Sequence, residues 1–315
     1  MSTTGSFNYQ GAGVPRGSIS TGLCFLERDK SGSDSAPVGL DQIAVTVPVH
    51  DGRGHELSLD THGFVLVPHA YDHIEYMNEA EIVGIYYKEV CELVQRQTGA
   101  IKVVAFDHNI RASETKSWMN EAGASPDSER IAGGNKVQSP AQVVHNDYTL
   151  TSAPLRMDLL GQPPKANDTW AKNTSGAPLI DPLEIDSLKS RRYAFINVWR
   201  SISDEPVTDM PLALCDGSTV CDEDLVTFEI RYADRVGENY FAGHSERHKW
   251  LYFPSMTKDE AILLKVWDSQ GAFCTSGVDP HVAATFSLHS AFSDPAAPAD
   301  GPKRRSIEVR TVAFY

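Results

Sequence analysis

The stretch Val144-His145-Asn146-Asp147-Tyr148-Thr149 places an imidazole and a carboxylate two residues apart. Its β-branched and aromatic residues favour a strand, and residues i and i+2 of a strand point to the same face. One nitrogen ligand and one oxygen ligand can therefore reach the same metal ion. A second histidine from elsewhere in the chain would complete two histidines and one carboxylate, the facial triad of non-haem Fe(II) oxygenases. Because a His-x-Asp triplet is common by chance, the rest of the chain has to supply further evidence.

The composition fits a globular protein without a polyanionic partner. The chain has 315 residues, 41% of them hydrophobic and 22% charged, enough for one large domain or two ordinary ones. Its formal charge of -14 argues against nucleic acid or an anionic membrane surface, because both would repel it. There is no apolar signal core at the N-terminus, and no apolar run approaches the roughly 20 residues of a membrane helix. We therefore expect a small-molecule substrate; the sequence does not indicate an oligomeric state.

The cysteines indicate a reducing compartment. Their number, five, is odd, and no C-x-x-C pair occurs among them. Free thiols fit this pattern better than a disulfide scaffold, and no zinc-finger spacing is present. We therefore expect a cytoplasmic protein.

The first 140 residues carry the best helix pattern. Residues 1–40 are polar with scattered Gly and Pro, which predicts an N-terminal extension that is partly irregular. Strands are predicted over residues 43–49, 63–67 and 103–106. Asn78 can cap a helix over residues 77–97, whose apolar residues recur at helical spacing and which Gly99 ends. Residues 112–140 are polar and lack periodicity, which is typical of a long loop or a lid.

Short strand patterns dominate residues 141–315. They occur over residues 193–200, 225–232, 249–253, 282–292 and 306–314. Short helices are predicted over residues 182–190, after an Asp-Pro pair, and over residues 261–265, after a capping-box spacing. Many short strands separated by turn signals predict a mainly β fold, a sandwich or jelly roll with added helices. Because no linker divides the chain, residues 41–315 are expected to form one domain, helix-bearing up to residue 140 and a jelly-roll core from residue 141.

Four histidines are candidates for the missing ligand because they lie late in the chain: His244, His248, His281 and His289. His244 and His248 could share a helix face, but a preceding glycine and a following strand pattern argue against a helix there. His281 follows an Asp-Pro turn and is expected to begin a strand. His289 lies inside an apolar strand pattern and is the candidate that we retain.

The next strand pattern carries Arg304, Ser306 and Arg310 at the same parity, so all three should point to one face. A fixed guanidinium beside a metal suits a carboxylate ligand, because its planar fork matches the two oxygens. Val312 and Phe314 share this parity and could line a pocket or belong to the core. A simpler interpretation is that Arg304 and Arg305 form a solvated basic turn and that His289 is a histidine of the core.

Seven short motifs follow one another along the chain: Asp107-His108-Asn109-Ile110-Arg111, His145-Asn146-Asp147-Tyr148-Thr149, Asn197-Val198-Trp199-Arg200, Pro211-Leu212-Ala213, Trp250-x-Tyr252-x-Pro254, His289-Ser290-Ala291-Phe292-x-Asp294-Pro295 and Arg304-x-Ser306-Ile307-Glu308-Val309-Arg310. Together they resemble the fungal hydroxylase/desaturase family, which includes a gibberellin desaturase, an aspergillic-acid hydroxylase and the CmcJ component of a cephem methoxylase. The resemblance covers residues 45–315.

The resemblance implies an Fe(II)- and 2-oxoglutarate-dependent dioxygenase on a double-stranded β-helix, a cupin-like jelly roll. Such an enzyme would use O2 to oxidise an unactivated C–H of a small molecule in secondary metabolism, by hydroxylation, desaturation or oxidative cyclisation, with amino acids among the possible substrates. By motif match, the catalytic iron ligands would be His145, Asp147 and His289. Arg304 and Ser306 would bind the far carboxylate of 2-oxoglutarate, with Arg310 as the fallback anchor.

Some matched positions have no role that the resemblance assigns. Arg305 stands where the family pattern has an acidic residue, but its side chain should point away from the site. His108, Arg111 and Arg200 match the pattern without an assigned role. His108 and Arg200 are kept as candidate substrate contacts, together with Val312 and Phe314.

Two alternatives stay open. A zinc-dependent hydrolase could use the same ligands, because zinc also binds two histidines and a carboxylate. The second alternative is a non-catalytic jelly-roll subunit of a two-component methoxylase. No G-x-S-x-G or G-x-G-x-x-G fingerprint supports a serine hydrolase or a dinucleotide-dependent dehydrogenase.

Overall fold

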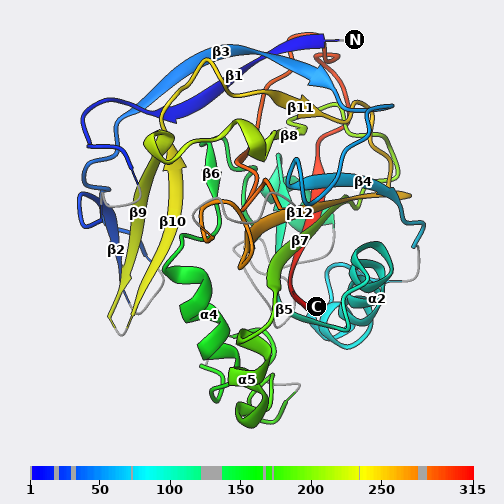
Figure 1. Cartoon of the computed structure of the whole chain (residues 1–315). Helices are drawn as coiled ribbons and strands as arrows, with labels where there is room; N and C mark the ends of the chain where they lie inside the picture. Colours follow the sequence, from blue (N-terminus) through cyan, green and yellow to red (C-terminus); the bar gives the residue numbers. More distant parts are fainter. Residues whose placement is uncertain are drawn as a thin grey trace.

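The computed structural model describes residues 2–17, 21–29, 33–71, 74–121, 137–165, 168–171, 174–233, 235–275 and 282–315. Within these residues the fold is built on two β-sheets, with helices at their periphery (Figure 1). One hydrophobic cluster contains side chains of both sheets, among them Leu214 and Leu251 of one and Phe195 and Ile262 of the other. The sheets therefore share a core, as the predicted jelly roll requires.

The larger sheet has nine strands, in the spatial order β1 (Ser2–Gln10), β3 (Gln42–Asp51), β11 (Trp250–Tyr252), β8 (Leu212–Cys215), β13 (His289–Ala291), β6 (His145–Asn146), β10 (Val236–Ala242), β9 (Leu225–Tyr232) and β2 (Cys24–Arg28). The smaller sheet has five, in the order β4 (Phe64–Pro68), β12 (Glu260–Asp268), β7 (Tyr193–Ser201), β14 (Arg305–Phe314) and β5 (Lys102–Ala112). Strands from both sides of residue 140 occur in both sheets, so the predicted division at that residue separates neither sheet.

Strand β7 shows why the smaller sheet is buried on both faces. Phe195 and Trp199 point into the core between the sheets, whereas Ile196 and Val198 point to the opposite face. Such alternation follows from the two-residue period of a strand. The opposite face packs on the helix α2 (Tyr87–Thr98), through side chains such as that of Val90.

The helix predicted over residues 77–97 is confirmed, with an irregular start. Asn78 caps α1 (Glu79–Glu81) by accepting a hydrogen bond from the backbone of Ala80, and Gly99 ends α2 in the left-handed conformation. Between them lies a π-helical turn, η1 (Ile82–Tyr86). The remaining helical elements are α3 (Thr115–Glu121), α4 (Ser152–Leu160), α5 (Pro182–Lys189) and the 3-10 turns η2 (Gly217–Thr219) and η3 (Asp222–Asp224).

The prediction of a helix over residues 261–265 is wrong, because this segment lies in β12. The backbone of Thr257 does donate to the Glu260 carboxylate at 3.0 Å, as in a capping box. The apolar run that follows is buried on both faces, however, and such a run suits a central strand better than a short amphipathic helix. Burial of both faces in the tertiary structure, and not the local capping hydrogen bond, therefore determines that this segment is a strand.

The N-terminal segment, expected to be a partly irregular extension, contributes two strands to the larger sheet, while residues 11–17 belong to no strand. Strand β1 pairs with β3 at one edge of the larger sheet, and β2 pairs with β9 at the other edge. Phe7 and Tyr9 of β1 are fully buried. The first strand is thus an integral part of the larger sheet. His281 and most of the predicted lid, residues 122–136, lie outside the described residues.

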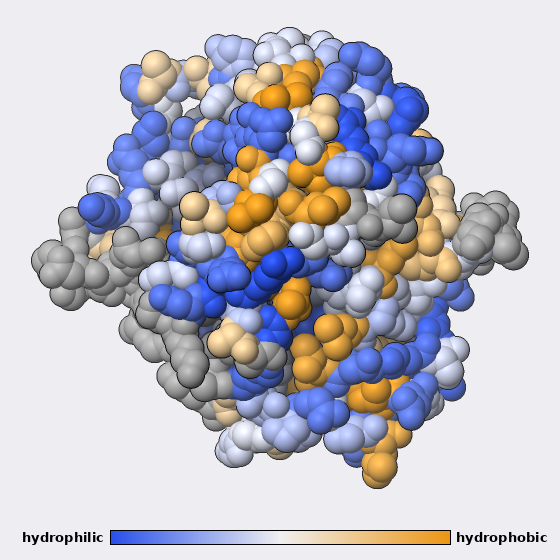
Figure 2. Space-filling view, turned by 90° about the vertical axis from the view of Figure 1, so that its left-hand side faces the viewer, coloured by the Kyte–Doolittle hydropathy of each residue, from blue (hydrophilic) through white to orange (hydrophobic). Residues whose placement is uncertain are grey.

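The surface carries little continuous apolar area on the face that contains β2 and β9. Figure 2 shows this face largely covered by hydrophilic side chains, with hydrophobic side chains in a broken band. Within the described part of the chain, no helix combines the length and the apolar character that crossing a membrane would require.

Candidate functional site

His145, Asp147 and His289 converge at the centre of the larger sheet. His145 in β6 lies directly opposite His289 in β13, and their ring centroids are 4.3 Å apart. Asp147 follows the end of β6. One ligand atom from each of the three side chains lies within 4.8 Å of the other two, and no other such group occurs among the described residues. The three side chains could therefore hold one metal ion.

Both histidines are oriented in the way that metal-ligating histidines require. The Nδ1 atom of His145 lies 2.8 Å from the carbonyl oxygen of Val143, and Nδ1 of His289 lies 3.2 Å from that of Ser287. Each Nδ1–H can donate to the carbonyl two residues earlier, which leaves the lone pair of Nε2 for a metal. Burial, reinforced by the neighbouring His289, lowers the pKa of His145 to about 4. The imidazole is therefore neutral near pH 7, as a ligand must be.

Asp147 is oriented by two partners on the smaller sheet. Its Oδ2 atom accepts hydrogen bonds from Nδ2 of Asn197 at 2.8 Å and from Nε of Arg310 at 3.3 Å. Burial alone would raise the pKa of Asp147, but Arg310 and the two histidines outweigh it and hold the pKa well below its usual range. Its Oδ1 atom lies toward His145, 3.8 Å from Nε2. The carboxylate is thus ionised and offers one oxygen to a metal.

Arg310 is already engaged by two carboxylates. Besides Asp147, its Nη1 atom contacts Oδ2 of Asp107 at 2.7 Å. Burial opposes the charged form, but Asp147 and Asp107 together raise the pKa of Arg310 above its usual value. Arg310 is therefore better suited to orient a metal ligand than to anchor a cosubstrate.

Arg304 presents a different guanidinium to the same region. It is 3% exposed, its Nε donates to Oγ of Ser306 at 3.1 Å, and its guanidinium lies 5.0 Å from the ring centre of Trp199. Another donor reaches the carbonyl oxygen of Met210 at 2.5 Å. Among the described residues, no carboxylate lies within 4.0 Å of its guanidinium, although the backbone amide of Arg304 donates to Oδ2 of Asp209 at 3.4 Å. Burial, aided by the charge of Arg111, lowers the pKa of Arg304 to about 9, so it remains mostly charged at pH 7 and lacks an anionic partner.

A single cavity joins these groups. Its lining comprises Asn109, Arg111, Ala141, His145, Asp147, Trp199, Leu212, His289, Ser290, Ala291, Arg304, Ser306 and Glu308. The three candidate metal ligands and the buried Arg304 thus open into the same space.

Comparison with known proteins agrees with this geometry. A family profile described as "Oxidoreductase/YMDC permease-like domain" matches residues 25–314. The hydroxylase/desaturase CTB9 of Cercospora beticola is 31% identical over 283 residues, which is 86% of this chain and 76% of that protein. The Fe(II)/2-oxoglutarate-dependent dioxygenase nvfI of Aspergillus novofumigatus is 33% identical over 278 residues, covering 85% and 82%. A solved structure of the iron and alpha-ketoglutarate-dependent endoperoxidase NvfI superposes with a TM-score of 0.72 at 26% identity, covering 100% of this chain and 97% of that chain.

The chain belongs to the hydroxylase/desaturase family. It is an Fe(II)- and 2-oxoglutarate-dependent dioxygenase, with O2 as the third reactant. The resemblance inferred from the seven motifs, the mainly β fold and the cofactors are thereby confirmed.

The dioxygenase site contains residues that the sequence did not single out. Asn197 was part of a matched motif but received no role, and Trp199 shares its strand parity. Glu308 lies between Ser306 and Arg310 at the same parity and lines the cavity. The alternation that selected the two arginines was therefore sufficient to find Glu308. Arg111, matched without a role, also lines the cavity.

The four candidate substrate contacts do not line the cavity of the dioxygenase. Val312 and Phe314 are fully buried in the core beside Tyr193, because β14 continues beyond the site into the interior. Arg200 is directed to the opposite face of β7, where it donates to the backbone carbonyl of Lys258. His108 faces α2, with its Nδ1 atom 2.9 Å from the Tyr87 hydroxyl. We therefore regard these four residues as part of the structural framework and not as substrate contacts.

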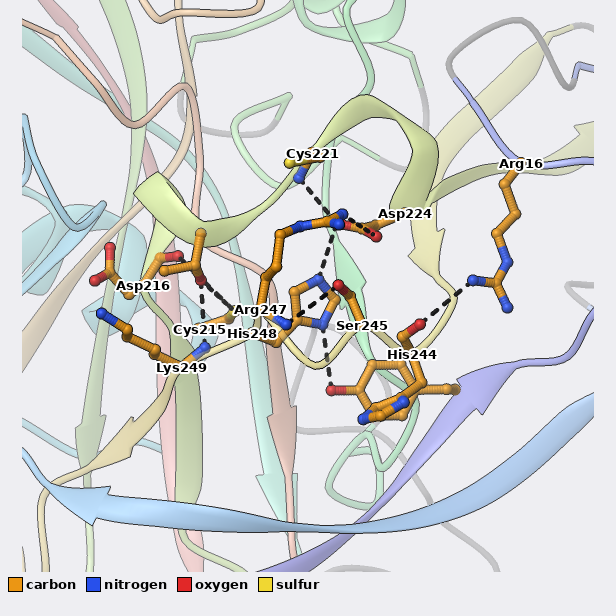
Figure 3. Close-up of polar contacts among 12 residues, drawn as sticks. Arg16, Cys215, Asp216, Cys221, Asp224, His244, Ser245, Arg247, His248 and Lys249 are labelled. Atoms are coloured by element: carbon orange, nitrogen blue, oxygen red, sulfur yellow. Dashed lines mark hydrogen bonds and ion pairs between the residues drawn. The ribbon is translucent and has the colours of Figure 1, made fainter.

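His244 and His248 belong to a separate network of the dioxygenase, which Figure 3 shows. Nε2 of His248 lies 3.2 Å from the Asp224 carboxylate, and Nδ1 lies 3.4 Å from the hydroxyl of Tyr9. The carbonyl oxygen of His244 accepts a hydrogen bond from Arg16 at 3.4 Å. Both ring nitrogens of His248 are therefore occupied, and this histidine is not available to a metal in the site.

Proposed function

We propose that His145, Asp147 and His289 hold the Fe(II) ion of this dioxygenase, and that Arg304 with Ser306 binds the far carboxylate of 2-oxoglutarate. The observation that carries the proposal is one cavity that joins three converging ligand atoms to a buried guanidinium with no carboxylate partner among the described residues. A mononuclear site with two histidines and one carboxylate leaves further coordination positions for cosubstrate and O2.

The bound iron and 2-oxoglutarate supply the oxidising chemistry, which couples decarboxylation of the 2-oxo acid to succinate with oxidation of the substrate by O2. The protein itself supplies positioning. The backbone carbonyls of Val143 and Ser287 fix the histidine rings, and Asn197 and Arg310 fix the carboxylate. Such outer partners are expected to set metal affinity as well as ligand orientation.

Burial is the second contribution of the protein. The side chains of Asp147 and His289 are 8% and 3% exposed, so little bulk water reaches the proposed ligands. The Trp199 ring covers one side of the Arg304 guanidinium. In such a low-dielectric cavity an ion pair between Arg304 and a carboxylate is stronger than in water.

The reaction type that we propose is oxidation of an unactivated C–H of a small molecule, by hydroxylation, desaturation or oxidative cyclisation. The relatives support this class by their names, which include hydroxylase/desaturases and an endoperoxidase. We also propose a cytoplasmic location, because all five cysteines are free thiols. A zinc hydrolase on the same ligands would leave the buried Arg304 without a function.

The proposal is tested by anaerobic addition of Fe(II) and 2-oxoglutarate, followed by O2 and a panel of amino acids, diketopiperazines and terpenoid acids. We expect a metal-to-ligand charge-transfer absorption before O2 is added, and succinate release that a true substrate accelerates. Activity with zinc alone, without O2 and without succinate, would instead support the hydrolase. No absorption and no succinate with any metal would support a non-catalytic subunit.

A further inference from the structure

The cavity contains a second guanidinium whose role the proposed function leaves open. Arg111 of β5 lines the cavity together with Arg304. Its Nη1 atom donates to the backbone carbonyl of Ser139 at 2.8 Å. Among the described residues, no carboxylate lies within 4.0 Å of the Arg111 guanidinium, and the same holds for the guanidinium of Arg304. Two guanidinium groups without a carboxylate in that range thus line one cavity, Arg304 being buried and Arg111 partly buried.

The sheet register places both guanidinium groups around Ser306. Arg111 lies directly opposite Ser306 in the antiparallel pair of β5 and β14. Directly opposed side chains of such a pair stand on the same face with Cβ atoms roughly 5 Å apart. The Ser306 hydroxyl in turn accepts the hydrogen bond from Nε of Arg304. Ser306 therefore neighbours both arginines.

The backbone around residue 138 holds Arg111 in this position. Gln138 pairs with β5 through two hydrogen bonds, to the carbonyl of Ile110 at 3.0 Å and from the amide of Ala112 at 2.9 Å. This pairing brings the Ser139 carbonyl next to the Arg111 guanidinium. One donor is thereby fixed, and the rest of the planar fork stays available for an anion.

The charges around the two arginines favour an added anion. Burial lowers the pKa of Arg111, and the charge of Arg111 adds to the effect of burial on Arg304. Glu308 is the carboxylate nearest along β14, but its closest cation is Arg310, with Oε1 at 4.0 Å from Nη2. Two neighbouring cations repel each other, and an anion placed between them would offset this repulsion.

We propose that Arg111 is a second anchor for the far carboxylate of 2-oxoglutarate, which is then held between Arg304 and Arg111 above Ser306. This inference rests on the proposed function. It extends the Arg-x-Ser anchor of β14 to the neighbouring strand, and it gives Arg111 a binding role that motif matching alone did not assign.

The test compares two 2-oxo acids that differ only at the far end. 2-Oxoglutarate carries the far carboxylate, and 2-oxopentanoate has a methyl group in its place. Each is titrated anaerobically into the Fe(II)-loaded protein, and Kd is read from the charge-transfer absorption. We expect Arg111→Gln to weaken 2-oxoglutarate binding by about 10- to 100-fold and to change 2-oxopentanoate binding by less than about twofold.

Further variants separate charge from geometry. Arg111→Lys keeps the charge without the planar fork, so its loss of 2-oxoglutarate affinity should be intermediate. Arg304→Gln should show the same selectivity between the two acids as Arg111→Gln. Arg96→Gln on the exposed side of α2 is the control and should bind both acids like the wild type.

Each outcome is decisive because both acids are compared in the same variant. Equal weakening of both acids by Arg111→Gln would indicate a structural role, and no weakening of either would exclude contact with the cosubstrate; both results overturn the inference. If the wild-type protein forms no charge-transfer complex with either acid, the proposed function itself fails. The two failures are therefore distinguishable.

Discussion

Two centres in the described part of the chain bring histidine and aspartate together, and they differ in what the histidines do. In the proposed iron centre, His145 and His289 bind backbone carbonyls through Nδ1 and turn their Nε2 atoms toward one another and Asp147. In the network of Figure 3, His248 uses one nitrogen for Asp224 and the other for Tyr9. A short distance between histidine and aspartate does not define a metal site. A metal site is defined by ligand lone pairs that converge on one point and accept no hydrogen bond from the protein.

The largest expected effect separates the two centres directly. His289→Ala should lose bound iron and reduce succinate formation by roughly 1,000-fold or more, since one of three ligands is removed. His248→Ala, in the other buried centre, should keep wild-type iron stoichiometry under conditions where it is folded. Metal analysis and coupled succinate assays measure both. Full iron occupancy in His289→Ala would refute the assignment of this ligand.

The next effect concerns the orientation of Asp147. Asn197→Ala removes the hydrogen bond to its Oδ2 atom, and a lost outer partner typically reduces metal affinity by about 10- to 100-fold. The matched control is Asn239→Ala. Nδ2 of Asn239 donates to the backbone carbonyl oxygen of Asp147 at 3.1 Å, and not to its carboxylate. Competition with a chelator gives both iron affinities. Equal affinities in the two variants would argue against a specific role for Asn197.

A smaller effect, on stability alone, is expected at Tyr9. Its hydroxyl accepts a hydrogen bond from Nε1 of the fully buried Trp250 at 2.7 Å and also contacts His248. Tyr9→Phe should lower the free energy of unfolding by about 1–3 kcal/mol, because the Trp250 donor is left unsatisfied. Denaturant unfolding measures the change. A Kd for 2-oxoglutarate that shifted as well would show that the two centres are coupled, contrary to the comparison.

The smallest effect is a pH dependence of the same network. Burial alone would raise the pKa of Asp224, but the hydrogen bond from His248 and neighbouring donors lower it below the usual value of 3.8. The ionised carboxylate therefore stabilises the fold above that value, and this contribution is lost as the pH falls through the lower folded-state pKa. The difference in unfolding free energy between wild type and Asp224→Asn should shrink as the pH is lowered from about 5 to 3. A constant difference over this range would contradict the assignment.

Strand parity was the part of the sequence that predicted the site best. It put His145 and Asp147 on one face, and it placed Arg304, Ser306 and Arg310 together. Parity predicts the direction of a side chain but not its partners. For this reason it could not distinguish Arg304, which lacks a close carboxylate, from Arg310, which Asp107 and Asp147 already occupy.

Motif matching alone was a weaker guide to individual roles. His108 and Arg200 belong to matched motifs, yet both side chains have structural partners. His108 contacts the hydroxyl of Tyr87 in α2, and Arg200 donates to the backbone carbonyl of Lys258. Val312 and Phe314 have the correct parity but lie too far along β14. How far the cavity extends along a strand depends on the opposite sheet, and a single sequence contains no direct signal of that distance.

The position of β14 also has a consequence for biosynthesis of the enzyme. This strand lies between β7 and β5 in the smaller sheet but follows every other strand of that sheet in sequence. During translation, β5 therefore has no neighbour in that sheet until residues 305–314 have left the ribosome. Since the same segment carries Ser306 and directly follows Arg304, completion of the sheet and delivery of the proposed cosubstrate anchor are one event. A chain truncated before it is expected to be both misassembled and inactive.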